Sequence, residues 1–235
     1  MCAQIPLVMT ISTNSDEIMT DNMTTVWIKV CGTTNSEDAL AAAGLGADAI
    51  GFVFAQSPRQ VSPEVAHEII KTLPPSVQTV GVFVDEDPER VASTADLCDL
   101  DLLQFHGKET AGYCGQFGRR VIKAVRIKDE DDLDVCSQYD GVVEAFLLDT
   151  YVTGQSGGTG VTFDWNIAHS ARKHGRIILA GGLNPDNVAA AIRVAKPYAV
   201  DASSGLEQKP GVKDHAKIAR FIRAVHQAEE TMDST

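Results

Sequence analysis

The stretch that decides the fold runs from residue 26 to residue 54 and reads VWIKVCGTTNSEDALAAAGLGADAIGFVF. Two short apolar runs, at 26–30 and 48–54, flank an alanine-rich segment with helical spacing. Nearly continuous apolar runs of this length are typical of strands that are buried on both faces. The stretch therefore predicts one β–α–β unit, in which the two strands run parallel.

The same alternation continues to the end of the chain. Six further strand candidates follow, at residues 77–84, 100–106, 120–125, 145–149, 176–182 and 198–204. A helix candidate follows each strand, and the weakest is 129–139. Eight such units predict a single-domain α/β protein, a (β/α)8 TIM barrel, over residues 25–230. A doubly wound open sheet is the alternative, although the first strand–helix turn lacks its GxGxxG fingerprint.

Composition and charge narrow the class of partner. The 235 residues carry a formal net charge of −12, which argues against nucleic acid or an anionic membrane as a broad partner surface. The five cysteines show no disulfide or metal-ligand spacing, so we expect free thiols, a cytoplasmic protein and no metal site. No apolar run reaches the length of a transmembrane helix.

Residues 1–24 differ from the rest of the chain. They are polar, lack a regular pattern and contain no Lys or Arg, so neither a signal peptide nor a transit peptide fits. We expect a disordered N-terminal extension, and Met23 is an alternative start of the protein.

In a barrel of this class the catalytic groups lie at the C-terminal ends of the strands. The first strand ends at Cys31, and a period of two places Lys29 on the same side. A nearby cation lowers the pKa of a thiol and favours the reactive thiolate, although a buried structural cysteine fits the position equally well. Asp149 ends the sixth strand on the face of Leu147, where a buried carboxyl indicates a general acid or base.

The last two strand ends predict an anion site. Residues 179–188 read LAGGLNPDNV and residues 200–207 read VDASSGLE. Glycines let backbone N–H groups approach a phosphate, and this is the usual phosphate position in such barrels. Two tight turns with helix caps are the plainer interpretation. The glycine-rich segment 154–160 is either a loop that closes over a ligand or a plain connection.

Eight motifs, spread over about residues 26–225, together resemble the phosphoribosylanthranilate isomerase family. In chain order they are KVCGTTN, GADAIGFVFAQSPRQVSP, VGVFVDE, LLQFHG, LLDT, GGTGVTFDW, LAGGLNPDNV and VDASSGLEQKPGVKD. The resemblance implies an Amadori rearrangement without a cofactor, in L-tryptophan biosynthesis. N-(5-phosphoribosyl)anthranilate becomes 1-(2-carboxyphenylamino)-1-deoxyribulose 5-phosphate.

The resemblance also implies roles for individual residues. Cys31 matches the general base, Asp149 the general acid, and Arg59 the arginine that faces the anthranilate carboxylate. The other expected substrate-binding residues are Gln104, His106, Gly157, Gly158, Gly160, Gly181, Gly182, Asn184, Asp201, Ser203, Ser204 and Gly205. The partner would be this phosphosugar–anthranilate substrate, and the protein would be a monomer or homodimer.

The sequence departs from the family pattern at a few positions, and three alternative functions are compatible with the same barrel. Val161 stands where we expect a lysine, and Thr33 stands where the family often has isoleucine. The alternatives are the histidine-pathway isomerase, indole-glycerol-phosphate synthase and a non-catalytic phosphosugar-binding protein. Cys31 at the end of the first strand disfavours the first, which typically uses two aspartates. Lys29 lies one step short of a catalytic position for the second, and the presence of both Cys31 and Asp149 disfavours the third.

Overall fold

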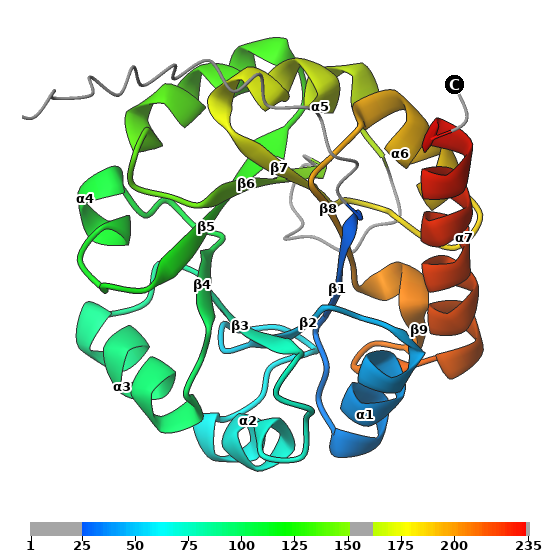
Figure 1. Cartoon of the computed structure of the whole chain (residues 1–235). Coiled ribbons are helices and arrows are strands. Elements are labelled where there is room, and N and C mark those ends of the chain that lie inside the picture. The colour runs from blue at the N-terminus through cyan, green and yellow to red at the C-terminus, as the bar shows by residue number, and fades with distance from the viewer. Residues whose placement is uncertain (1–24, 151–161, 234–235) are drawn as a thin grey trace, which may run out of the picture.

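The computed structural model describes residues 25–150 and 162–233, and its central feature is a closed barrel of eight parallel strands in sequence order (Figure 1). The strands are β1 (Trp27–Cys31), β2 (Ala49–Val53), β3 (Gln78–Phe83), β4 (Leu102–Phe105), β5 (Arg120–Ile127), β6 (Ala145–Thr150), β7 (Arg176–Leu179) and β8 (Ala199–Ala202). The predicted single-domain (β/α)8 barrel is therefore confirmed.

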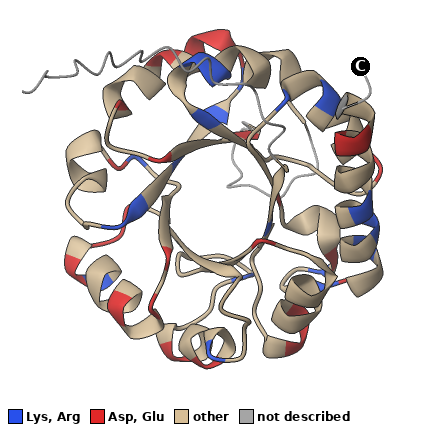
Figure 2. Cartoon of the chain, in the orientation of Figure 1, with Lys and Arg blue, Asp and Glu red and all other residues tan. Residues whose placement is uncertain are grey.

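Helices surround the barrel on the outside (Figure 1). They are α1 (Ser36–Leu45), α2 (Pro63–Ile70), α3 (Pro88–Cys98), α4 (Ala111–Cys114), α5 (Trp165–Ala171), α6 (Val188–Ala195) and α7 (His215–Asp233), with 3₁₀ segments η1 (Glu130–Tyr139), η2 (Arg172–His174) and η3 (Ser204–Leu206). Charged residues lie mainly on these helices and on the connecting loops (Figure 2). No helix in the described residues is long and apolar enough to cross a bilayer.

Local sequence signals explain where the first helices begin and end. Asn35 caps α1 through a side-chain oxygen that accepts a hydrogen bond from the backbone N–H of Asp38. Ser62 and Asp87 cap α2 and α3 in the same way, and a proline follows each at the first helical position. Gly46 ends α1 with φ +108°, a conformation that favours glycine.

The strands separate two apolar regions. Alternate residues face the barrel interior, where a small cluster includes Val80, Ile122, Leu147 and Ile178. The larger cluster lies between the strands and the helices, and Phe52 and Phe105 belong to it. Toward the C-terminal ends of the strands, the barrel interior beyond the small cluster is not filled with apolar side chains. Polar groups occupy this rim instead.

Several details differ from the sequence-based prediction. A helix was predicted after the fourth strand, as after every other strand, but α4 covers only four residues because glycines at 112, 115 and 118 interrupt the segment. An unpredicted hairpin, β9 (Glu207–Lys209) and β10 (Val212–Lys213), follows β8. Helix α7 continues to Asp233, past the expected boundary at residue 230. The predicted disordered extension and Met23 lie outside the described residues.

Candidate active site

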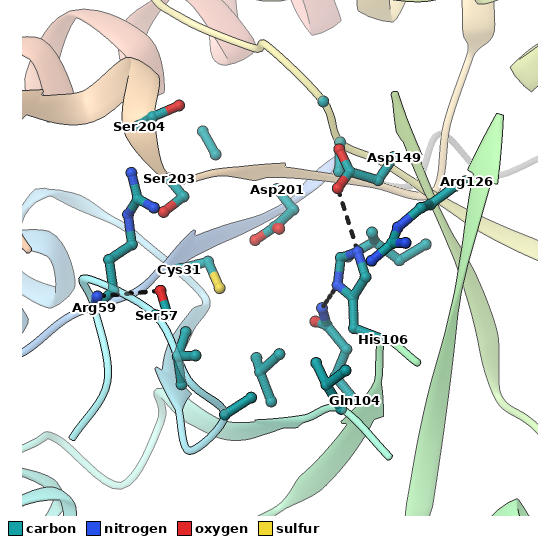
Figure 3. Close-up of a pocket in the computed structure, with 18 of the residues that line it drawn as sticks. Cys31, Ser57, Arg59, Gln104, His106, Arg126, Asp149, Asp201, Ser203 and Ser204 are labelled. Carbon is teal, nitrogen blue, oxygen red and sulfur yellow. Dashed lines mark hydrogen bonds and ion pairs between the residues drawn. The ribbon is translucent and has the colours of Figure 1, made fainter. Parts of the chain in front are cut away.

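One pocket opens at the C-terminal end of the barrel, inside the ring of strands (Figure 3). Strand ends and the loops after them supply its walls. The polar and charged lining residues include Cys31, Ser57, Arg59, Gln104, His106, Arg126, Asp149, Asp201, Ser203 and Ser204. A concave site with converging polar groups in this position is the usual active site of the fold.

Cys31 ends β1 with its side chain in the pocket, and Lys29 lies on the same interior face, as the period of two predicted. The Lys29 ammonium is fully buried and lies 2.8 Å from Oδ1 of Asp201. A Cβ atom built on Gly51 would lie 2.9 Å from Sγ of Cys31 and 3.1 Å from Nζ of Lys29. The thiol and the ammonium therefore converge over the same glycine, which has no side chain to separate them.

Two opposing effects act on the pKa of Cys31. Burial raises the pKa of the Cys31 thiol above its ordinary value, and this outweighs the opposing charges of Lys29 and Lys213. Burial also disfavours the ammonium of Lys29, but Asp201 and Cys31 more than compensate, so the pKa of Lys29 is raised. Lys29 lowers the thiol pKa, as expected for a nearby cation, but desolvation of the thiolate is the larger effect. Lys29 limits the rise rather than reversing it.

Asp149 is the last residue but one of β6 and lies across the pocket from Cys31, and a short chain of side chains orients it (Figure 3). Its Oδ1 accepts a hydrogen bond from the backbone N–H of Thr150 at 2.9 Å, and its Oδ2 lies 3.3 Å from Nε2 of His106. The other ring nitrogen, Nδ1, lies 3.2 Å from the amide nitrogen of Gln104. With this arrangement, Gln104 donates to Nδ1 and leaves the proton on Nε2, where it faces the carboxylate.

The loops after β7 and β8 form one wall. Gly181 and Gly182 have φ +77° and +69°, and a Cβ on Gly181 would lie 2.5 Å from the backbone nitrogen of Thr150. Only glycine suits both the dihedral angles and the space. Among the described residues, the N–H groups of Gly182 and Ser203 donate to no backbone acceptor. Free donors of this kind suit an anion such as phosphate.

Arg59, in the loop after β2, lies across the pocket from Asp149 (Figure 3). Its Nε and Nη2 donate to the two carboxylate oxygens of Glu207, each at 2.8 Å. Arg126, at the end of β5, also lines the pocket, but its side chain forms no ion pair within the described residues. The pocket therefore presents two cations, of which one is already paired.

The structure brings most of the predicted site residues to this one pocket. Cys31, Arg59, Gln104, His106, Asp149, Gly181, Gly182, Asp201, Ser203 and Ser204 line it. Asn184 and Gly205 do not: Asn184 bonds within its own turn, and Gly205 packs against the backbone of Leu183. Gly157, Gly158, Gly160 and Val161 lie outside the described residues. The described residues contain no cluster that could hold a metal ion.

Sequence reasoning did not predict three charged residues in or next to the pocket. Arg126 directly follows the predicted strand 120–125 but was not predicted to bind substrate. Glu207 and Lys213 lie in a motif that was quoted only for the resemblance. Their signal was weak, because charged residues in a loop are ordinarily solvated. Both Glu207 and Lys213 are buried here, and that burial could not be read from the local sequence.

A buried thiol and a carboxyl group that face one pocket, beside a wall of glycine-rich loop backbone, are typical of an acid–base enzyme of the (β/α)8-barrel class. The family model for N-(5'phosphoribosyl)anthranilate (PRA) isomerase matches residues 28–224. The chain belongs to this family. The isomerase of Pelobacter propionicus is 53% identical over 197 residues, which cover 83% of this chain and 93% of that protein.

Solved structures agree with this assignment. A crystal structure of monomers generated from the dimeric isomerase of Thermotoga maritima is 42% identical, with a TM-score of 0.77, and covers 86% of this chain and 99% of that chain. A second isomerase structure, in complex with reduced 1-(o-carboxyphenylamino)-1-deoxyribulose 5-phosphate, is 42% identical with a TM-score of 0.78 and the same coverage. The alternative functions on the same barrel therefore lose their support.

Proposed function

We propose that this chain isomerises N-(5'-phosphoribosyl)anthranilate, with Asp149 as general acid and Cys31 as general base. The reaction follows from membership of the family. The residue roles are supported by one observation: a buried thiol and an oriented carboxyl group face one pocket from different strands. The reaction moves hydrogen within one molecule, so one acid and one base are sufficient for it.

The first step is opening of the ribose ring. Asp149, in its protonated form, delivers a proton to the ring oxygen as the bond between this oxygen and C1′ breaks. The nitrogen lone pair then forms a double bond with C1′, which gives a protonated Schiff base. The contacts of Asp149 with the Thr150 N–H and with His106 support this role, because they hold the carboxyl group in one orientation.

The second step is removal of the C2′ proton. The positive Schiff base nitrogen makes this proton acidic, and the Cys31 thiolate accepts it. The electron pair from the C2′–H bond moves between C2′ and C1′, and the bond electrons of C1′–N return to nitrogen. The enolamine then becomes the aminoketose when C1′ is protonated and the C2′ hydroxyl loses its proton. The buried ammonium of Lys29 stabilises the thiolate that this step needs.

Binding of the substrate uses the rest of the pocket. The phosphate would lie against Gly181, Gly182, Ser203 and Ser204, and the anthranilate carboxylate would face Arg59. We extend the same proposal to Gly157, Gly158 and Gly160, which lie outside the described residues, and to Asn184 and Gly205, which would shape the phosphate loops from behind. Gln104 and His106 would act by orienting Asp149, and Asp201 by holding Lys29.

The experiment is a fluorescence assay. Freshly prepared phosphoribosylanthranilate is added to the purified full-length chain, and loss of anthranilate-type fluorescence reports turnover. Failure to turn over this substrate would exclude the proposal. We also expect a cytoplasmic protein that is a monomer or homodimer, as a dimeric relative exists in T. maritima. Light scattering of the purified protein measures the oligomeric state.

A further inference from the structure

Glu207 lies outside the pocket but contacts one of its cations. It begins β9, it is buried, and it is absent from the pocket lining. Its two carboxylate oxygens accept hydrogen bonds from Nε and Nη2 of Arg59, each at 2.8 Å. A carboxylate that pairs with both nitrogens on one side of a guanidinium fixes the plane of the group as well as its position.

This pairing leaves half of the guanidinium free. The group carries five N–H donors, and Glu207 occupies one on Nε and one on Nη2. Two donors on Nη1 and one on Nη2 remain. One donor on each of these nitrogens forms a second edge that can hold another carboxylate in a bidentate manner. Glu207 therefore presents Arg59 to a substrate carboxylate without using the edge that such a carboxylate needs.

The aliphatic part of the Arg59 side chain is also restrained by its neighbours. It passes over Gly32, which has φ +74°, and a Cβ atom on this glycine would lie only 2.5 Å from Cδ of Arg59. The backbone N–H of Arg59 also donates to Oγ of Ser57 at 3.1 Å. Both ends of the side chain are thus restrained, so little conformational freedom remains to be lost when a ligand binds.

Lys213 connects this arrangement to the catalytic strand. Its buried ammonium donates to Oε1 of Glu207 at 3.1 Å, to the backbone oxygen of Cys31 at 2.6 Å and to that of Ser203 at 3.3 Å. One ammonium therefore joins the end of β1, the end of β8 and the carboxylate that holds Arg59. The distance between the arginine and the proposed base is set by these contacts.

We propose that Glu207 is a positioning residue that fixes Arg59 for recognition of the substrate's aromatic carboxylate, with Lys213 holding Glu207 in place. This inference rests on the proposed function, because it takes the anthranilate carboxylate as the group that Arg59 meets. Glu207 acts through Arg59 and contacts no part of the substrate itself.

The test uses two ligands that differ by one group. The first is the reduced product analogue with its 2-carboxyphenyl group, and the second is the same compound with a plain phenyl group. Calorimetry of the wild-type chain should show that the carboxylated ligand binds at least about tenfold more tightly. In Glu207→Gln this preference should largely disappear, because the affinity for the carboxylated ligand falls while the affinity for the phenyl ligand stays within about twofold. In turnover, KM should rise more than kcat falls.

A matched control and a double variant complete the experiment. Glu144 also accepts hydrogen bonds from Nε and Nη2 of one arginine, Arg120, but at the opposite end of the barrel from the pocket. Glu144→Gln should keep the wild-type preference. Adding Glu207→Gln to an Arg59→Met background should cause no further loss, because a positioning residue has no effect once its target is gone.

Three results would overturn the inference. They are an unchanged preference in Glu207→Gln, equal weakening of both ligands, and tighter binding of the carboxylated ligand, which would mean that Glu207 competes with it. If Glu207→Gln does not fold, Glu207→Asp keeps the charge opposite Lys213 but is one methylene shorter, and it should lose part of the preference. Failure of the proposed function would be seen in the wild-type chain and not in the variants. The wild-type chain would then bind both ligands equally or turn over no substrate.

Discussion

The ammonium of Lys29 lies 2.8 Å from the carboxylate of Asp201 in the fully enclosed interior of the barrel, beside the Cys31 thiol. The Lys29 ammonium keeps a positive charge next to the position where the proposed thiolate forms. The Asp201 carboxylate pairs with this ammonium when the thiolate is absent. An unpaired ammonium in such a place would lose its proton. The proposed role of Cys31 therefore involves a pair in which Lys29 is fully buried and Asp201 lines the pocket.

Replacement of Lys29 should change the pH dependence of turnover. In the proposed mechanism the thiolate is the active form, so kcat/KM should fall as the pH falls through the pKa of Cys31. Lys29→Met removes a charge that lowers this pKa, and the rising limb of the pH profile should move to higher pH. Lys123→Met is the matched control, because Lys123 is also buried and paired, with Glu109, but lies outside the pocket. An unmoved limb in Lys29→Met would show that Lys29 does not act on the thiol.

Cys31→Ser should lower kcat by about 10²- to 10⁴-fold, because a hydroxyl is a far weaker base than a thiolate at the same position. The fold should survive this nearly isosteric change. Cys98→Ser is the control, since Cys98 is buried in α3 away from the pocket. The measurement is steady-state turnover together with circular dichroism. Near wild-type turnover in Cys31→Ser would exclude the proposed general base.

Asp149→Asn should have an effect of similar size, about 10²- to 10⁴-fold in kcat, because the amide cannot deliver a proton to the ring oxygen. The amide oxygen can still accept the hydrogen bond from the Thr150 N–H, so the orientation of the side chain is retained. Asp186→Asn provides the same chemical change at an exposed ion pair with Arg220. Equal turnover in the two variants would contradict the assignment of Asp149.

Gly205 and Gly44 should respond in opposite ways to alanine. A Cβ on Gly205 would lie 2.1 Å from the backbone oxygen of Leu183, so Gly205→Ala should push the phosphate loops apart. We expect a loss of about 1–3 kcal/mol in the free energy of unfolding and a higher KM. Gly44 in α1 has no atom within 4 Å of this position, and Gly44→Ala should stabilise by about 0.4–1 kcal/mol. Urea unfolding measures both changes, and destabilisation of equal size would contradict this interpretation.

Acid should weaken the contribution of Glu207 to stability. Burial alone would raise the pKa of its carboxyl, but the hydrogen bonds from Arg59 and the charge of Lys213 outweigh this and lower it. The stabilisation is therefore complete above the unfolded-state pKa of about 4.3 and is lost as the pH falls through the lower folded-state value. The difference in unfolding free energy between wild type and Glu207→Gln should shrink over that range. A difference that does not change with pH would argue against this ion pair.

The sequence by itself determined the barrel and its rim. Alternating apolar runs and capped helices, from the unit at 26–54 onward, require strands that are covered on both faces, and eight such units close a barrel. Because strand ends meet at one rim, Cys31 and Asp149 could be placed together from spacing alone. These inferences rest on the local periodicity of apolar residues, which can be read directly from the sequence.

Only the tertiary structure decided how the site is charged. Lys29 and Asp201 come from opposite ends of the chain, as do Arg59 and the pair of Glu207 and Lys213. Their distances and burial arise when the barrel closes and when the β9–β10 hairpin folds back toward β1. Desolvation, which raises the pKa of Cys31, depends on everything that surrounds the thiol. For that physical reason the sequence predicted the position of this cysteine and the neighbouring cation, but not the net direction of the shift in its pKa.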